Sequence, residues 1–88
     1  PYGIIINSSA KIGTGLTIRA QSLIGNKGPA GSPCPVIGDN VDFGIGAKVI
    51  GDVRIGDKTK IGVNAVVTKS APNDSILVGI PAHNIATK

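Results

Sequence analysis

The single cysteine, Cys34, and the single histidine, His83, are two residues of this 88-residue sequence that could act as a nucleophile or a general base. A thiolate can attack an electrophile, and an imidazole can accept a proton near neutral pH. A catalytic zinc site of the carbonic anhydrase kind needs about three histidine ligands, so one histidine excludes it. We therefore predict no metal site, and we expect His83 to be a surface residue rather than a base.

The positive charge of the chain points to an anionic ligand. The formal net charge is +4 and the sequence pI is about 9.6. The nine Lys and Arg residues form no run, and one Phe, one Tyr and no Trp offer no platform for stacking bases. These features exclude nucleic acid as the expected partner. Two interpretations stay open, a solvated basic surface and a site for a smaller anion such as the phosphates of a coenzyme.

A single cysteine excludes an internal disulfide framework and is typical of a reducing compartment. The sequence has no apolar run of about 18 residues and no pattern of a signal peptide. We therefore expect a cytoplasmic location without membrane contact. The chain begins Pro1-Tyr2-Gly3 without an initiator Met, so we expect it to be a fragment of a longer protein.

A six-residue repeat organises the sequence. Large apolar residues recur at every sixth position: Ile6, Ile12, Ile18 and Ile24, then Ile37, Phe43, Val49, Ile55, Ile61 and Val67. Four positions later the residue is mostly small or β-branched: Ala10, Leu16, Ser22, Val41, Ala47, Val53, Thr59, Ala65 and Ala71. Glycine often follows the large residue directly, at Gly13, Gly25, Gly38, Gly44, Gly56 and Gly62.

This six-residue period matches neither an amphipathic helix nor a heptad. The turn residues also lie too close together in the sequence for independent hairpins. Short strands that alternate inward and outward would bury positions one and five of each hexad. Gly and Asn at the corners would supply the positive φ that a tight corner needs. Hexads of this type resemble the left-handed parallel β-helix family, whose crossovers break the usual right-handed rule. The resemblance implies an all-β solenoid with three hexads per 18-residue coil: 6–23, 37–54 and 55–72, plus a coil interrupted after Ile24.

Two segments leave the repeat. The segment from about residue 26 to residue 36 is rich in Gly and Pro, so we expect it to form an extruded loop. Loops on rigid scaffolds often have a functional role. The hexads stop after Pro72. We therefore predict a β-helix domain over 1–72 and a C-terminal tail over 73–88 that packs on or near a coenzyme groove.

Three segments narrow the family: Cys34-Pro35-Val36-Ile37-Gly38, Phe43-Gly44-Ile45-Gly46-Ala47-Lys48, and Ile61-Gly62-Val63-Asn64-Ala65-Val66-Val67 followed by Val78-Gly79-Ile80-Pro81-Ala82. Their order is similar to the C-terminal part of hexapeptide-repeat acyltransferases of the serine acetyltransferase type. The resemblance implies O-acetyl transfer from acetyl-CoA to a small hydroxyl acceptor. L-serine, as in cysteine biosynthesis, is the first candidate acceptor, and a sugar or polysaccharide hydroxyl is the second.

In that family a histidine removes the proton of the acceptor hydroxyl. The family motif is a histidine, two variable residues, a glycine and an aliphatic run, and Gly3-Ile4-Ile5-Ile6 matches its last part. The catalytic histidine is therefore expected directly before Pro1. The resemblance leaves no catalytic residue in this chain, so the chain alone should be inactive.

A second family histidine lies before a proline at the end of the extruded loop, and Cys34 holds its place here. The resemblance makes Cys34 a neighbour of the acceptor site. The alternative is a loop cysteine without chemistry. The change from histidine puts specificity for serine in doubt.

The resemblance also places the coenzyme on backbone groups of adjacent coils. The expected contacts are Gly44, Ile45, Gly46, Gly62, Val63, Asn64, Gly79 and Pro81, with Lys60 and Lys69 near the phosphates. Ile45 and Val63 are bulkier than the usual alanine and could narrow the groove. The family's active site lies between subunits, so a homotrimer is expected. The competing hypothesis is a non-catalytic structural trimer on the same scaffold.

Overall fold

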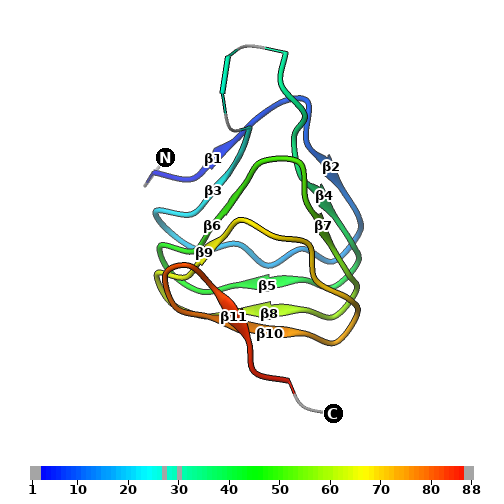
Figure 1. Cartoon of the computed structure of the whole chain (residues 1–88), viewed down its shortest axis with the longest axis vertical. Helices are drawn as coiled ribbons and strands as arrows, with labels where there is room; N and C mark the ends of the chain where they lie inside the picture. The colour runs from blue at the N-terminus through cyan, green and yellow to red at the C-terminus, as the bar shows by residue number, and fades with distance from the viewer. Residues whose placement is uncertain (1–2, 27, 30, 87–88) are drawn as a thin grey trace.

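The computed structural model describes residues 3–26, 28–29 and 31–86, which form a prism of three sheets wound by one chain (Figure 1). Sheet A contains β1 (Ile5–Ile6), β3 (Leu23–Gly25), β6 (Lys48–Ile50) and β9 (Val66–Val67). Sheet B contains β2 (Lys11–Ile12), β4 (Val36–Ile37) and β7 (Arg54–Ile55). Sheet C contains β5 (Asp42–Phe43), β8 (Lys60–Ile61), β10 (Ile76–Val78) and β11 (His83–Asn84). Within these ranges there is no helix of the length and apolarity needed to cross a bilayer.

The chain runs from sheet A to B to C and back, so three corners recur in every coil. The A/B corner is formed by residues 7–10, by the described residues 26, 28–29 and 31–35, and by residues 51–53 and 68–70. The B/C corner is formed by residues 13–16, 38–41, 56–59 and 72–75. The C/A corner is formed by residues 19–22, 44–47, 62–65 and 79–82.

Strand pairing confirms the predicted coil of 18 residues. Ile6 pairs with Ile24, and Phe43 pairs with Ile61, in parallel and 18 positions apart. The pairing of Ile12 with Ile37 is longer, because the extruded loop adds residues between these two strands. In Figure 1 this loop stands out at one end of the prism, above β1 and β2.

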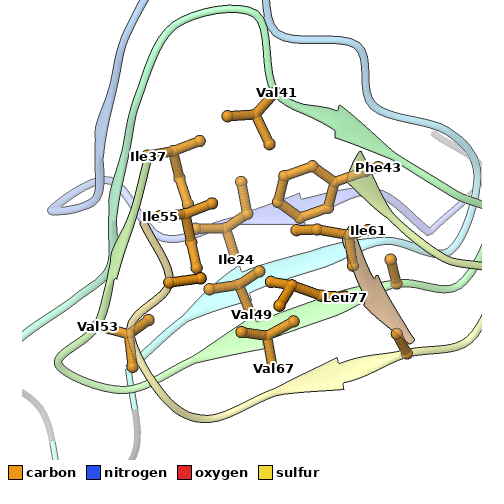
Figure 2. Packing of buried hydrophobic residues seen from close by; sticks show 13 residues of the cluster. Ile24, Ile37, Val41, Phe43, Val49, Val53, Ile55, Ile61, Val67 and Leu77 are labelled. Carbon is orange, nitrogen blue, oxygen red and sulfur yellow. The ribbon is translucent and has the colours of Figure 1, made fainter. Parts of the chain in front are cut away.

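The core contains both inward positions of the repeat. Ile24, Phe43, Val41, Val49 and Ala47 have no exposed surface, and Figure 2 shows the large side chains converging on the axis of the coil. Ser22, Thr59 and Ser75 are buried too, and their hydroxyls donate to backbone carbonyls, which removes the penalty for burying them. Ile6 is 40% exposed because no coil of the described chain covers the end of the prism where it lies.

Positive φ at corner Gly and Asn residues is confirmed at Gly15, Asn40, Gly46 and Asn64, but the glycines that directly follow the large residue of each hexad are not among these positions. The left-handed positions lie two residues further on and include Gly15, Asn40, Gly46, Lys58 and Asn64. Gly38 and Gly44 instead face the next coil at close range: a Cβ on Gly38 would lie 2.9 Å from the amide nitrogen of Asp57, and one on Gly44 would lie 2.8 Å from that of Val63. Glycine is needed here because two backbones touch.

The hexad pattern ends after Pro72, but the stacking continues. β10 pairs in parallel with β8, with Leu77 beside Ile61, and Leu77 is 4% exposed. The spacing of this pair is 16 residues instead of 18, which hides Leu77 from a search at multiples of six. β11 then turns back antiparallel to β10 and forms the last strand of the prism.

Candidate functional site

A groove of about 370 Å³ runs along the outer side of sheet C to the C/A corner. Its lining residues are Arg19, Asp42, Gly44, Ile45, Lys60, Ile61, Gly62, Val63 and Ile76. The strand register explains how these residues meet, since Asp42 pairs with Lys60 and Lys60 pairs with Ile76. Residues 16 to 18 positions apart in the sequence therefore form one continuous row.

The groove is apolar at the corner and charged on the sheet. Ile45 and Val63 are 50% and 66% exposed and form the apolar rim of the groove. Arg19 is held by an ion pair with Asp42, and its guanidinium also donates to the carbonyl of Phe43 at 2.8 Å. Lys60 is exposed and takes part in no ion pair that the described residues form. Lys60 thus gives the charged end a cation in excess.

Backbone geometry at the corner is set by coil stacking. The amides of Gly44 and Gly62 donate to the carbonyls of Ile61 and Leu77, at 2.7 and 2.8 Å. The amide of Asn64 donates to the carbonyl of Ile45 at 2.9 Å. No acceptor within the described chain is found for the amides of Ile45 and Val63, the two residues on the rim. Two fixed N–H donors are therefore available beside an apolar surface.

Five residues expected to bind the coenzyme line this one groove: Gly44, Ile45, Lys60, Gly62 and Val63. Gly46 and Asn64 lie beside it at the same corner, where the Asn64 side chain packs against Gly46. Gly79 lies one coil further along this corner, and its carbonyl accepts from the amide of Val66 at 3.0 Å.

Pro81 and Lys69 do not line the groove. Together with His83 they line a separate cavity of about 390 Å³ between the last turn of the coil and the C-terminal hairpin. Four residues line the groove but were not among the expected contacts: Arg19, Asp42, Ile61 and Ile76. The 18-residue period would have pointed to Asp42, since it lies one period before Lys60.

Cys34 lies at a different corner. It is half-buried and lines a cavity of about 680 Å³ between the extruded loop and the first coil. The side chains around it are mainly amides and hydroxyls, and the other lining residues are Asn7, Ser9, Lys11, Asn26, Gly28, Gly31, Ser32, Pro33 and Val36. This cavity is at the A/B corner, whereas the groove is at the C/A corner. Sheet A lies between the two corners.

Comparison with known proteins shows which proteins this chain is similar to. No family model matches the chain. The chain is 39% identical over 84 residues to a serine acetyltransferase of Mycobacterium tuberculosis, which covers 94% of this chain and 37% of that protein. It is 34% identical to the solved serine acetyltransferase of Neisseria gonorrhoeae, with a TM-score of 0.90 over 96% of this chain and 33% of that one. A serine acetyltransferase solved in complex with CoA gives a TM-score of 0.86 at 29% identity, over 94% of this chain and 34% of that one.

The similarity confirms the left-handed parallel β-helix predicted from the hexads. It also shows that the chain spans about a third of the length of the relatives it matches.

Proposed function

We propose that this chain, which is homologous to part of the serine acetyltransferases, contributes the coenzyme-binding β-helix of an O-acetyltransferase. The enzyme would transfer the acetyl group of acetyl-CoA to the hydroxyl of a small acceptor. The single observation behind this proposal is the groove at the C/A corner, in which five of the residues expected to bind the coenzyme meet.

The apolar and the charged parts of the groove suit different parts of acetyl-CoA. The pantetheine arm is a thin chain with two amide groups, and it would lie over Ile45 and Val63. Their free amides can donate to its carbonyls at little entropic cost, because the backbone is already fixed by coil stacking. Lys60 at the other end of the groove would contact the phosphates as a point charge.

The transfer itself requires a base, which we place in a histidine directly before Pro1. That base would take the proton of the acceptor hydroxyl, and the oxygen would attack the thioester carbonyl. The carbon–sulfur bond then breaks, and the CoA thiolate leaves and is protonated. The chain on its own would bind the coenzyme without turning it over.

L-serine is the acceptor that the similarity favours, because a related Neisseria gonorrhoeae serine acetyltransferase was solved in complex with serine. A sugar hydroxyl is the second candidate, and the cavity around Cys34 favours it. That cavity of about 680 Å³ offers the amides of Asn7 and Asn26 and the hydroxyls of Ser9 and Ser32, which suit a ligand with several hydroxyls.

We further propose that the protein acts as a homotrimer in the cytoplasm. The groove and the Cys34 cavity are at opposite edges of sheet A, so a second copy is needed to bring one against the other. The single cysteine suits a reducing compartment.

Calorimetric titration of the chain with acetyl-CoA tests the coenzyme site. We expect binding in the micromolar to millimolar range, and we expect Val63→Glu to abolish it by placing a negative charge on the rim. Ile85→Glu is the matched control, since Ile85 is similarly exposed, at 56%, but does not line the groove. Equal affinity of Val63→Glu and the unaltered chain would refute this assignment. Thiol release assays with L-serine, on protein that includes the preceding residues, then test the reaction.

A further inference from the structure

Arg19 lines the groove and is held in place by two groups of the next coil. Its Nη1 atom forms the ion pair with Asp42 and also donates to the carbonyl of Phe43 at 2.8 Å. Its Nε and Nη2 atoms form no hydrogen bond with any residue that the structure describes. The side chain is 45% exposed, so a guanidinium with unused N–H donors is fixed at the wall of the groove.

The apolar rim of the groove is lower in the first coil than further along the prism. The amide of Gly46 donates to the carbonyl of Ala20 at 3.0 Å, and the amide of Asn64 donates in the same way to the carbonyl of Ile45. Ala20, Ile45 and Val63 therefore hold the same position of the C/A corner in three successive coils. Because the side chain of Ala20 ends at Cβ, a ligand can lie closer to the corner backbone here than beside Ile45.

The proposed base would reach the groove from its Arg19 end. A Cβ on Gly3 would lie 3.5 Å from the Cα atom of Gln21, so Gly3 lies at the C/A corner beside the first coil. A residue directly before Pro1 is three positions upstream of Gly3, which spans at most about 10 Å. Lys60 lies in the other direction, two strand spacings or about 10 Å beyond the segment that contains Arg19. If the thioester lies near the base, it lies at the Arg19 end of the groove.

We infer that Arg19 is a catalytic residue of the acetyl transfer, in which it stabilises the negative charge on the oxygen of the acetyl carbonyl. This inference rests on the proposed function, which supplies the position of the base and the direction of the coenzyme. When the acceptor oxygen forms its bond to the carbonyl carbon, an electron pair of the C=O double bond moves to the carbonyl oxygen. The unused N–H donors of Arg19 bind this oxyanion until the carbon–sulfur bond breaks and the CoA thiolate leaves.

The surroundings of Arg19 suit this role. A donor that is already fixed needs no reorganisation when charge develops, and such donors are often the largest contribution to catalysis. Asp42 and the carbonyl of Phe43 fix the guanidinium before any ligand binds. The lining residues include two cations, Arg19 and Lys60, and one carboxylate, so the groove stays net positive. Arginine also keeps its charge at every pH at which a histidine base is active.

Infrared spectroscopy of acetyl-CoA bound to the chain, with ¹³C in the thioester carbonyl, tests this contact without turnover. A charged donor polarises the C=O bond, so the stretching frequency should fall below its value for acetyl-CoA in water. Arg19→Ala should abolish this fall, whereas the affinity for acetyl-CoA, measured by calorimetry, should stay within about 3-fold, because the contact is strong only in the transition state. Arg54→Ala is the matched control, since Arg54 is an exposed arginine on sheet B, and it should keep the full shift.

Turnover by protein that includes the preceding residues gives the second measurement. Arg19→Ala should lower kcat by about 10²–10³-fold with little change in the KM for acetyl-CoA or L-serine. Arg54→Ala should leave kcat unchanged. Circular dichroism verifies that the variants are folded, and Arg19→Gln replaces Arg19→Ala if the latter is not.

The other outcomes separate this role from its alternatives. A carbonyl frequency that does not fall, or a fall that survives Arg19→Ala, would overturn the inference. A raised KM for L-serine with an unchanged kcat would overturn it too and would give Arg19 to the carboxylate of the acceptor. Equal weakening of CoA and acetyl-CoA binding, without a change in the carbonyl frequency, would give Arg19 to the phosphates. An unaltered chain that does not bind acetyl-CoA would refute the proposed function, and this inference with it.

Discussion

The amide of Asp39 donates a hydrogen bond of 2.7 Å to the Oδ1 atom of Asp57, which lies one coil further along the prism. The same contact recurs on either side. The amide of Thr14 donates to Asp39 at 2.9 Å, and the amide of Asp57 donates to Asn73 at 2.7 Å. Side chains of Asp and Asn thus tie each B/C corner to the next, where the strands themselves do not pair.

We predict that Asp57→Ala destabilises the chain by about 1–2 kcal/mol, because the Asp39 amide loses its charged acceptor and only water replaces it. Asp57→Asn should be close to neutral, since Asn73 fills the same role in the next coil. Chemical denaturation monitored by circular dichroism measures both values. Equal losses of stability for the two substitutions would show that these side-chain hydrogen bonds between B/C corners contribute nothing.

The glycine column at the same corner gives a second prediction. A Cβ on Gly38 would lie 2.9 Å from the amide nitrogen of Asp57 and 3.0 Å from the carbonyl carbon of Gly56, so two coils would have to separate. Gly38→Ala should cost about 2–3 kcal/mol or more.

Gly25→Ala is its matched control. Gly25 also follows a large repeat residue directly, but a Cβ there would meet only the Leu23 side chain, at 3.6 Å. We expect the free energy of unfolding of this variant to lie within about 1 kcal/mol of that of the unaltered chain. Similar midpoints of thermal unfolding for both variants would contradict the close-approach explanation.

Most of this architecture could be predicted from the sequence, because every hexad must bury the same two inward positions. Ile24, Ile37, Phe43 and Val67 are buried as their spacing demands. Positive φ was predicted correctly for corner residues such as Asn40 and Gly46. It does not explain the glycine directly after the large residue, since a one-dimensional pattern does not distinguish a positive φ from a close contact between coils. Leu77 was missed because the last coil is two residues shorter than the others.

The groove was harder to predict than the coils. Gly44 and Gly62 were found because a motif contains them. Arg19 was not found because its contact with Asp42 crosses the coil that the extruded loop lengthens, so no multiple of 18 joins the two residues. A site built from outward positions produces no periodic pattern of apolar residues in the sequence. Only the pairing of the strands shows which of its residues meet.

Phe43 gives a prediction about the core. It is the only phenylalanine of the chain, it has no exposed surface, and it packs in the column that contains Ile61 and Leu77 (Figure 2). Phe43→Ala should cost about 3–5 kcal/mol because so thin a core cannot close over the cavity. Since small domains are stable by about 5–15 kcal/mol, a measurable unfolded fraction is expected. Phe43→Leu should cost less than half as much, and equal costs would mean that the column relaxes freely.

Lys60 and the nearby Lys58 provide the last prediction, which concerns the orientation of the coenzyme. Lys60 lines the groove, whereas Lys58 lies two residues earlier at the B/C corner with a φ of 59°. If Lys60 contacts the phosphates, Lys60→Gln should weaken acetyl-CoA binding by about 5-fold, as expected for an exposed ion pair. Lys58→Gln should leave the affinity unchanged. Because pantetheine lacks the phosphates, its affinity should be the same for Lys60→Gln and the unaltered chain. Titration with acetyl-CoA and with pantetheine checks this orientation. If Lys60→Gln also lost affinity for pantetheine, the pantetheine arm, and not the phosphates, would lie beside Lys60. The coenzyme would then lie in the groove in the opposite direction.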